Sequence, residues 1–223
     1  MRVILASASL RRSEILTEWG VAFEALPAVD VDESAARGTA VDVAMRLARD
    51  KASSVLRRCA KEPGGIVVIG ADTVVELEGD LLGKPAGDAE ARAMLERLSG
   101  RTHRVVTGLA VGSRAGSLRV ASETSEVTFS RLDREAIDAY VATGDPKGKA
   151  GAYGIQSKGA RLIAGFTGCY YNIVGLPIRR LIGLLPPEVL PASRRECGCE
   201  KHALWRGGLG CGREGPAGRG GAP

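Results

Sequence analysis

Small hydroxyl side chains and two arginines occupy a turn near the start of the chain, from Ser7 to Arg12, between an apolar run and a helix-like segment. A helix N-terminus exposes unpaired N–H groups and a positive partial charge, so small residues and arginines at such a turn suit a bound phosphate. The turn is not a Walker loop, because the glycine spacing and the Lys-Ser/Thr pair are absent. A plain N-cap with two surface arginines is an equally good interpretation of these residues alone.

Three more charged residues interrupt apolar patterns further along the chain. Lys51 falls on the apolar face of a predicted helix, although a lysine stem can also pass along such a face to reach solvent. Asp72 follows the predicted strand 66–69, and open α/β sheets bind their ligands at the carboxyl ends of such strands. A local capping role for this carboxylate is the alternative. Lys84 follows a predicted hairpin and stands between a glycine and a proline.

An acidic loop and a glycine-rich run complete the set. Glu33 lies in the acidic loop, and the run 148–156 ends in Gln156. Its glycines suit tight turns or a close approach of the backbone to a ligand, which is a weak indication on its own. Taken together, fixed cations can bind phosphoryl oxygens, and carboxylates are the hard oxygen ligands that a magnesium ion prefers. The combination predicts a site for a polyphosphate and its divalent cation.

Alternating apolar runs and helix-period segments must position these residues. Strands are predicted at 2–6, 22–26, 66–69, 105–111 and 122–129, with a hairpin at 74–82. Helices are predicted between Ser9 and Gly20 and at 41–60, 89–98, 134–142 and 177–185. Crossover and hairpin strands together predict a layered α/β domain with a mixed sheet over residues 1–186. Residues 187–223, rich in glycine, proline and arginine, are expected to form a disordered tail outside that domain.

Composition excludes several classes of protein. The 223 residues are 44% hydrophobic and 26% charged, as in ordinary globular proteins. No window approaches the ~18 apolar residues of a membrane span. The apolar run at the N-terminus is shorter than the ~7–15 residues of a signal peptide, so we expect a cytoplasmic protein. A net charge of +5 with 4% aromatic residues gives nucleic-acid binding little support.

Two other groups could do chemistry. Cys197, Cys199, His202 and Cys211, in the expected tail, are four potential zinc ligands. Their spacing fits no standard zinc site, and five scattered cysteines indicate reduced thiols in general. His103 could shuttle a proton near neutral pH, but a structural or oligomer-contact role explains it at least as well, so it stays outside the predicted catalytic set.

Eight ordered blocks of the chain resemble the Maf family of nucleoside triphosphate pyrophosphatases, also called septum-formation inhibitors. They are LASASLRR (5–12), VDE (31–33), ARDKA (48–52), GADTV (70–74), GKP (83–85), LSGRTH (98–103), GAYGIQ (151–156) and VGLP (174–177). The blocks extend over nearly all of residues 1–186, and many blocks in order are far more specific than any single motif. Leu10 departs from the family pattern, which has proline there.

The resemblance implies an elongated, inosine triphosphatase-like α/β domain with a central cleft, and usually a homodimer. It also implies hydrolysis between the α and β phosphates of a nucleoside triphosphate, with Mg²⁺ or Mn²⁺. By position, Asp72 resembles the proton acceptor that activates water, with Glu33 beside it for metal or water. Which of the two is base and which is metal ligand stays open at the level of sequence. The implied phosphate cradle consists of Ser7, Arg12, Lys51 and Lys84.

Within this family, two branches differ in base preference. The branch that acts on dTTP and UTP has arginine in the first turn, threonine after the cleft aspartate and glutamine at the end of the glycine-rich run. This chain has Arg11, Thr73 and Gln156 there. The branch that prefers 7-methyl-GTP has tryptophan, glutamine and glutamate. A glutamine amide can donate to and accept from a pyrimidine edge, whereas a carboxylate suits a cationic methylated guanine. The resemblance therefore implies dTTP and UTP, and modified pyrimidine nucleotides as further substrates.

Two other functions remain open from the sequence. One is a non-catalytic, nucleotide-binding regulator of septum formation, against which the intact Asp72, Glu33 and Lys51 argue. The other is nucleic-acid binding through basic residues, which lacks interleaved aromatic side chains. For an active enzyme, the resemblance implies a role in cell division arrest or in keeping non-standard nucleotides out of nucleic acids.

Overall fold

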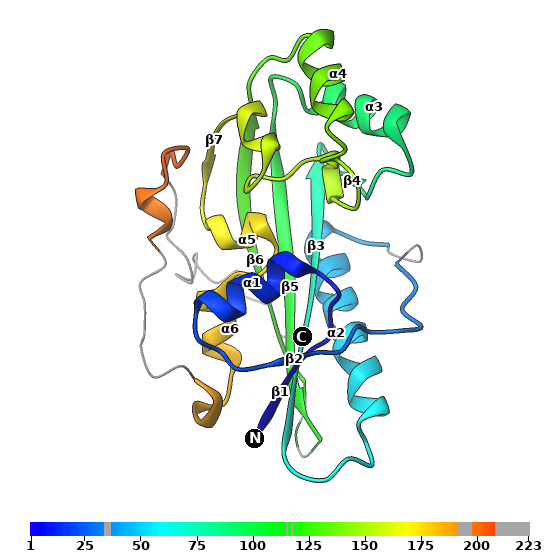
Figure 1. Ribbon diagram of the computed structural model, residues 1–223, viewed down its shortest axis with the longest axis vertical. Helices are drawn as coiled ribbons and strands as arrows, with labels where there is room; N and C mark the ends of the chain where they lie inside the picture. Colours follow the sequence, from blue (N-terminus) through cyan, green and yellow to red (C-terminus); the bar gives the residue numbers. More distant parts are fainter. Residues whose placement is uncertain (34–36, 115, 117, 191–197, 208–223) are drawn as a thin grey trace, which may run out of the picture.

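A mixed seven-stranded sheet forms the centre of the computed structural model, which describes residues 1–33, 37–114, 116, 118–190 and 198–207 (Figure 1). The strand order is β2-β1-β3-β5-β6-β7, with β4 paired to β3. β1 runs parallel to β2 and β3, and the other neighbours are antiparallel. The strands are β1 (Arg2–Leu5), β2 (Glu24–Ala25), β3 (Ile66–Leu77), β4 (Asp80–Leu82), β5 (Thr102–Ser113), β6 (Arg119–Phe129) and β7 (Ile163–Thr167). The predicted mixed α/β sheet is confirmed.

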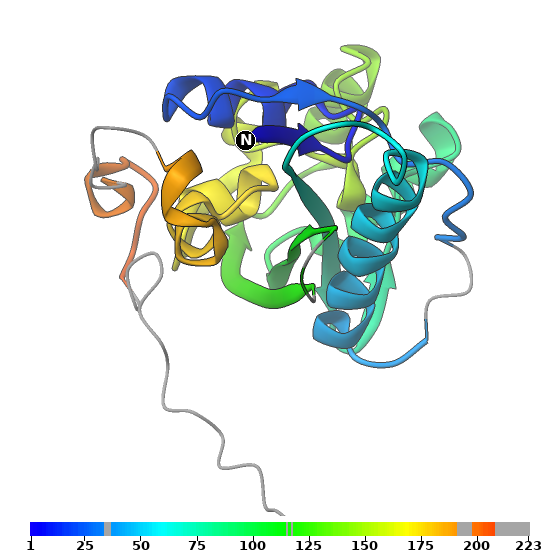
Figure 2. The ribbon, with the colours of Figure 1, turned by 90° about the horizontal axis from the view of Figure 1, so that it is seen from below.

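Helices cover both faces of this sheet. The α-helices are α1 (Leu10–Glu18), α2 (Ala40–Arg58), α3 (Asp88–Leu98), α4 (Arg134–Ala142), α5 (Tyr170–Val174) and α6 (Ile178–Leu184). Short 3₁₀ turns are η1 (Ala150–Ala152), η2 (Lys158–Leu162), η3 (Pro187–Val189) and η4 (Cys199–Lys201). α2 lies on one face, and α5 and α6 lie on the other (Figure 2). Figure 1 shows an elongated domain whose long strands follow its long axis.

The position of α2 depends on two glycines of the sheet. A Cβ on Gly70 would lie 2.1 Å from the backbone oxygen of Ala48, and one on Gly108 would lie 2.2 Å from that of Ala44. Any side chain there would push the helix outward, so glycine lets α2 lie directly on β3 and β5. A capping box between Thr39 and Asp42 begins this helix. Its buried alanines then complete the close contact.

The largest difference between the predicted and the observed elements concerns β3. The sequence predicts a strand at 66–69 and a separate hairpin from residue 74, whereas β3 runs unbroken from Ile66 to Leu77. Its ladder with β5 continues through Asp72 and Gly108, which leaves no break between the two predicted pieces. Asp72 therefore lies in the middle of a strand, and the expectation that it ends one is wrong. The interpretation of Asp72 as a local cap is wrong for the same reason.

One edge of β3 is nevertheless open beside Asp72. β1 pairs with β3 as far as Leu5 and Ile69, and β4 pairs with β3 from Val75 onward. Between these pairings, residues 71–74 have no strand partner on that side within the described part of the chain. Because successive side chains of a strand point to opposite faces, Asp72 faces α2 and Thr73 faces α1, yet both border this gap.

Part of the expected tail contacts the domain. Backbone N–H of Phe166 in β7 donates to Leu204 at 2.8 Å, and that of Arg206 donates to Phe166 at 2.7 Å. Residues 198–207 thus lie along the edge strand, with Cys199 buried beside Cys169. Cys197 and Cys211, of the conceivable zinc set, are outside the described residues. The domain boundary at 186 and 187 stays a prediction. None of the described helices has both the length and the apolar character of a membrane span.

Candidate active site

The gap beside β3 opens into a cleft of about 810 Å³. Segments from all along the domain line it, among them the turn between β1 and α1, the loop after β2, α2, β3 and the segments that follow β4 and α4. The nine residues that the sequence singled out for binding or catalysis all border this cleft, namely Ser7, Arg11, Arg12, Glu33, Lys51, Asp72, Thr73, Lys84 and Gln156. Residues far apart in the chain therefore meet at one place.

Two lysines and two carboxylates form a continuous chain of ion pairs in the cleft. Lys51 Nζ lies 2.5 Å from Asp72 Oδ1 and 2.7 Å from Glu33 Oε1. Lys84 Nζ lies 3.1 Å from Glu33 Oε2. The side chain of Lys51 is 12% exposed and that of Lys84 is 56% exposed. Lys51 therefore does not pass its ammonium into solvent, which was the alternative from sequence. The close seat of α2 on Gly70 and Gly108 brings it to Asp72.

The two carboxylates differ in how many of their oxygens are bound. Both oxygens of Glu33 accept from a lysine, whereas Asp72 Oδ2 has no hydrogen-bond partner among the described residues. Burial by itself would raise the pKa of Glu33, but the hydrogen bond and charge of Lys51, with those of Lys84, lower it to about 2. Glu33 is thus held ionised and fully engaged. Asp72 keeps one oxygen available for a ligand or a water molecule.

Arg12 is the most constrained cation of the cleft. Its Nε donates to the Gly175 carbonyl at 2.9 Å, one terminal nitrogen donates to Ser7 Oγ at 3.0 Å and the other donates to Thr73 Oγ1 at 3.1 Å. The residue is 9% exposed, so the interpretation of both arginines as surface residues is wrong for Arg12. A guanidinium held on three sides still keeps donors for a planar anion, because it carries five N–H groups.

The turn before α1 leaves its backbone donors available to a ligand. Ser9 is the N-cap, as the sequence predicts, but its side chain makes no capping hydrogen bond. Instead the Ser7 hydroxyl accepts from the Ser9 N–H at 3.2 Å. The first N–H groups of a helix require some partner, and here they border the cleft.

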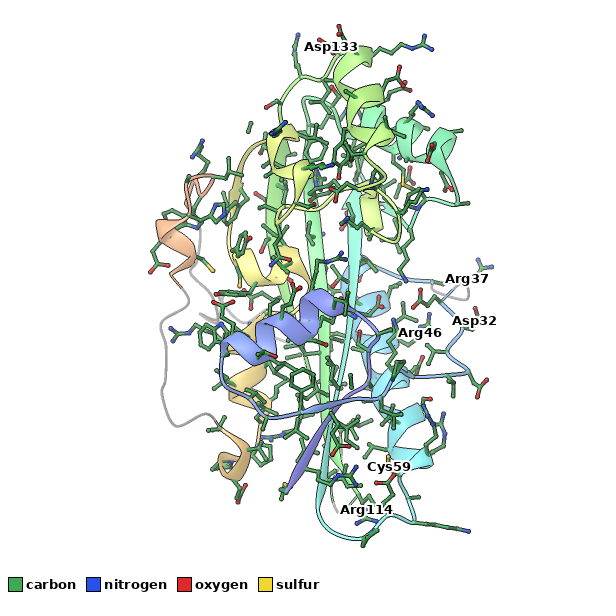
Figure 3. All side chains as sticks on the ribbon, viewed as in Figure 1. Asp32, Arg37, Arg46, Cys59, Arg114 and Asp133 are labelled. Carbon is green, nitrogen blue, oxygen red and sulfur yellow. The ribbon has the colours of Figure 1, made fainter. Side chains whose placement is uncertain are left out.

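Asp32, in the loop that carries Glu33, lines a separate hollow with Arg46 on the outer side of α2 (Figure 3).

Sequence reasoning missed a second cluster, which holds the glycine-rich loop. Asp145 accepts from the hydroxyls of Tyr140 and Ser157, both at 2.6 Å, and from Lys149 Nζ at 3.0 Å. Burial would raise the pKa of Asp145, but the Ser157, Tyr140 and Lys149 contacts together lower it. Lys149 and Ser157 also line the cleft beside Gln156. Lys149 lies within the glycine-rich run that the sequence singled out, whereas Asp145 stands before a proline and has the pattern of an ordinary turn residue.

His103 lies beneath this loop and is 2% exposed. Its Nε2 is 2.7 Å from the hydroxyl of Tyr153, whose ring borders the cleft. Both rings pack edge-on against Phe129. Burial lowers the pKa of His103 to about 4, so the imidazole is neutral near pH 7. The geometry is that of a structural histidine, in agreement with its place outside the predicted catalytic set.

The donor set for a divalent cation consists of two carboxylates. No group of three or more histidine, cysteine, aspartate or glutamate side chains gathers for a metal within the described ranges. Mg²⁺ typically binds one or two carboxylates together with substrate phosphates and waters, rather than a cage made only of protein. Glu33 and Asp72 lie on either side of Lys51 and fit that kind of site. The arrangement can therefore bind a polyphosphate and a cation that arrives with it.

Proteins similar in sequence carry one recurring name. The dTTP/UTP pyrophosphatase of Symbiobacterium thermophilum is 48% identical over 186 residues, which cover 82% of this chain and 92% of that protein. That of Methylobacillus flagellatus is 47% identical over 186 residues, covering 82% and 91%. That of Bacillus thuringiensis is 45% identical over 181 residues, covering 81% and 92%.

Two solved structures are weakly similar. A nucleoside-triphosphatase (dITP/XTP pyrophosphatase) from Mycobacterium abscessus has a TM-score of 0.37 and 16% identity, over 59% of this chain and 76% of its own. The Ham1 protein of Staphylococcus aureus has a TM-score of 0.40 and 14% identity, over 58% and 72%. The fold described above is therefore taken from the strand pairing of this chain and not from these two structures. The family model described as "Maf-like protein" matches residues 2–187, and with it the whole set of cleft residues, so this chain belongs to the Maf-like protein family.

Proposed function

We propose that this protein hydrolyses dTTP and UTP between the α and β phosphates, releasing the nucleoside monophosphate and pyrophosphate. The observation that carries the proposal is the chain of ion pairs Asp72–Lys51–Glu33–Lys84 inside the cleft. A polyphosphate needs fixed cations on its oxygens, and attack on phosphorus needs a carboxylate that can accept a proton from water. The relatives named dTTP/UTP pyrophosphatase support the same reaction and the same substrates.

Asp72 acts as the general base in this proposal. Its Oδ2 is unbound, and one free carboxylate oxygen suffices to accept a proton from water. Glu33 is the weaker candidate, because both of its oxygens are engaged and its pKa is lowered to about 2. In this proposal Glu33 pairs with Lys51 and Lys84 and contributes to the divalent-cation site. Lys51 pairs with Oδ1 of Asp72 and not with Oδ2, so it leaves that second oxygen to the water molecule.

The phosphate groups are bound by the cradle that the resemblance implies. Ser7 presents its hydroxyl from the turn before α1, Arg12 presents N–H donors from the first turn of α1, and Lys84 presents an exposed ammonium. Cations on the leaving pyrophosphate stabilise the negative charge that develops on it. Arg11 and Gln156 are proposed to select the base, Gln156 by hydrogen bonds to the pyrimidine edge. Thr73, from the same specificity set, contacts Arg12.

A divalent cation, Mg²⁺ or Mn²⁺, belongs to the proposal. Glu33 and Asp72 are the residues that would hold it, together with oxygens of the bound triphosphate. When bound, such an ion neutralises phosphoryl oxygens and polarises the phosphorus toward attack. Chelation with EDTA is expected to abolish turnover, and added Mg²⁺ or Mn²⁺ to restore it. A homodimer is also proposed from the family resemblance, which sedimentation of the purified chain would test.

The test is a side-by-side assay of dTTP, UTP and 7-methyl-GTP with Mg²⁺ or Mn²⁺, in which pyrophosphate and the monophosphate are both measured. We expect release of pyrophosphate from dTTP and UTP, and much less from 7-methyl-GTP. Release of inorganic phosphate alone, or no turnover of any triphosphate, would contradict the proposed reaction. The alternative, a non-catalytic regulator of septum formation, predicts growth arrest that survives Asp72→Asn; the paired carboxylate with a free oxygen favours the enzyme.

A further inference from the structure

A line of hydrogen bonds leads from the cleft into the interior of the sheet. Arg12 donates to Thr73 Oγ1 at 3.1 Å, and Thr73 Oγ1 lies 2.9 Å from Thr107 Oγ1. The Thr107 hydroxyl donates in turn to the backbone carbonyl of Asn172 at 3.0 Å. These four residues come from α1, β3, β5 and α5. The line crosses from β3 to β5 and ends on α5, the helix that directly precedes Gly175.

The direction of each hydrogen bond in this line follows from the number of protons available. A hydroxyl has one hydrogen, and that of Thr107 is used on the Asn172 carbonyl. Thr107 Oγ1 must then accept from Thr73, so the single hydrogen of Thr73 is also used. Thr73 Oγ1 is left as an acceptor, which is what the N–H of Arg12 requires. The line therefore runs in one direction, from the guanidinium to the carbonyl.

The inner end of the line is rigid. Thr107 and Asn172 are 0% exposed. The Asn172 amide accepts from the Thr107 N–H at 3.1 Å and donates to the Val105 carbonyl and to Ser125 Oγ, both at 2.9 Å. Buried polar side chains require such complete hydrogen bonding, because each unpaired group carries a desolvation penalty. A fully paired network of this kind holds its members in a single arrangement.

We infer that Thr107 and Asn172 are positioning residues, which act through the hydroxyl of Thr73 to orient the Arg12 guanidinium for a phosphate of the substrate. This rests on the proposed function, since it assigns Arg12 to the phosphate cradle. Each terminal nitrogen of Arg12 has one hydrogen committed, to Ser7 or to Thr73, and one left over. Fixing the plane of the guanidinium before substrate binds removes the need to order it afterwards. Thr73 thus influences substrate binding through Arg12 and not through a hydroxyl proton of its own.

Thr107→Val is the variant that breaks the line, because valine keeps the shape of threonine and removes only the hydroxyl. Thr107→Ser keeps the hydroxyl and loses the methyl group. Thr102→Val is the matched control: Thr102 is on the same strand and pairs its hydroxyl with Thr128 at 2.8 Å, but lies outside the cleft. The assay is pyrophosphate release from dTTP, with KM and kcat determined separately and thermal unfolding recorded for each variant.

We expect Thr107→Val to raise KM for dTTP roughly tenfold and to change kcat by less than about twofold, as loss of an interaction that is made equally in the ground and transition states does. The effect stays moderate because Arg12 keeps its contacts with Ser7 and Gly175. Thr107→Ser should keep KM within about twofold of wild type even if its melting temperature falls. Thr102→Val should leave both kinetic constants unchanged.

Arg12→Lys provides a second readout that a purely structural role of Thr107 would not affect. A lysine ammonium cannot span Ser7, Thr73 and Gly175 at once, so in this background Thr107→Val should have no further effect on KM. An equal effect in both backgrounds, or an unchanged KM in the single variant, would overturn the inference while turnover by the wild type upholds the proposed function. If the wild type releases no pyrophosphate, the affinity for inorganic tripolyphosphate decides. Thr107→Val must then weaken tripolyphosphate binding relative to Thr102→Val, and equal or absent binding overturns the inference.

Discussion

The two ends of the cleft are built in different ways. At one end, Lys51 and Asp72 stand on a long helix and a long strand, and their ion pair crosses from one to the other. At the other end, Gln156 stands on the loop 148–157, and Lys149 and Ser157 of this loop both donate to the carboxylate of Asp145. Regular elements hold charged groups more precisely than loops do, whereas loops vary and adapt more easily. If the proposed function holds, phosphate chemistry depends mainly on residues anchored to regular elements, and base recognition depends on the cluster around Asp145.

The largest effect is expected from Asp72→Asn. The amide keeps the shape of the carboxylate but cannot accept a proton from water, so kcat should fall by about 10²–10⁴-fold while KM changes little. Pyrophosphate release from dTTP measures it. Asp80→Asn is the matched control, because Asp80 is an exposed residue of β4 paired with Arg97 outside the cleft. Equal activity of the two variants would remove Asp72 from the role of base.

Lys51→Met should have the next largest effect. Loss of the ammonium leaves Asp72 and Glu33 without the cation between them, and we expect roughly a 10²-fold loss of kcat/KM. It should also raise the pKa of Glu33, which Lys51 holds down at about 2. In the wild type Glu33 therefore stays ionised until the pH falls toward about 2, whereas in the variant it protonates at higher pH, nearer its ordinary value. The acid limb of the pH–rate profile should move upward, with the exposed Lys61→Met as control.

Asp145→Asn tests the clamp at the other end of the cleft. An amide cannot accept equally from Tyr140, Ser157 and Lys149, so the loop that carries Gln156 should loosen. We expect KM for dTTP to rise about tenfold, with a smaller change in kcat, and the preference for dTTP over 7-methyl-GTP to narrow. Asp138→Asn is the control, because Asp138 pairs with Arg92 on the surface. An unchanged preference would show that the clamp has no part in base recognition.

The smallest effect on activity is expected at His103, whose contribution is to stability. Its folded pKa of about 4 lies below the ordinary value of 6.5, so the folded state binds fewer protons than the unfolded state between these values. The contribution of His103 to the free energy of unfolding should be fully present above about pH 6.5. As the pH drops to about 4, the free energy of unfolding should fall by up to about 3 kcal/mol. Urea unfolding over this range measures it. His103→Gln should flatten the slope.

Much of the fold was predictable from residue patterns. The helix at 134–142 has the same bounds in the structure. The predicted helix at 89–98 begins one residue after α3, and the one at 177–185 extends one residue beyond each end of α6. A helix with one apolar face shows its period clearly in the sequence. β3 was not predictable as one strand, because Gly70, Asp72 and Thr73 interrupt its apolar run. The strand accommodates them because Gly70 allows the close approach of α2, and because Asp72 and Thr73 have polar partners in Lys51 and Arg12.

In the candidate site, too, some residues were predictable from the sequence and others were not. The residue types predicted a polyphosphate site with four cations and two carboxylates, and all six border the cleft, namely Arg11, Arg12, Lys51, Lys84, Glu33 and Asp72. Asp145, Thr107 and Asn172 had no signal, because a turn aspartate and single polar residues in apolar runs are common. Their importance depends on contacts with residues distant in the chain. Hydrogen-bond partners of that kind are decided by packing, which no local pattern contains.

The sequence by itself determined the α/β class, the family and the chemical types of groups available, because each of these depends on local composition and on ordered motifs. Only the tertiary structure decided that the pairing of β1 with β3 ends at Ile69 and that the pairing of β4 with β3 begins at Val75, which opens β3 beside Asp72. It also decided which oxygen of each carboxylate stays unbound and in which direction the protons of Thr73 and Thr107 point. The physical reason is that strand pairing and hydrogen bonding join residues far apart in the chain, and their geometry is set only when the whole sheet has formed.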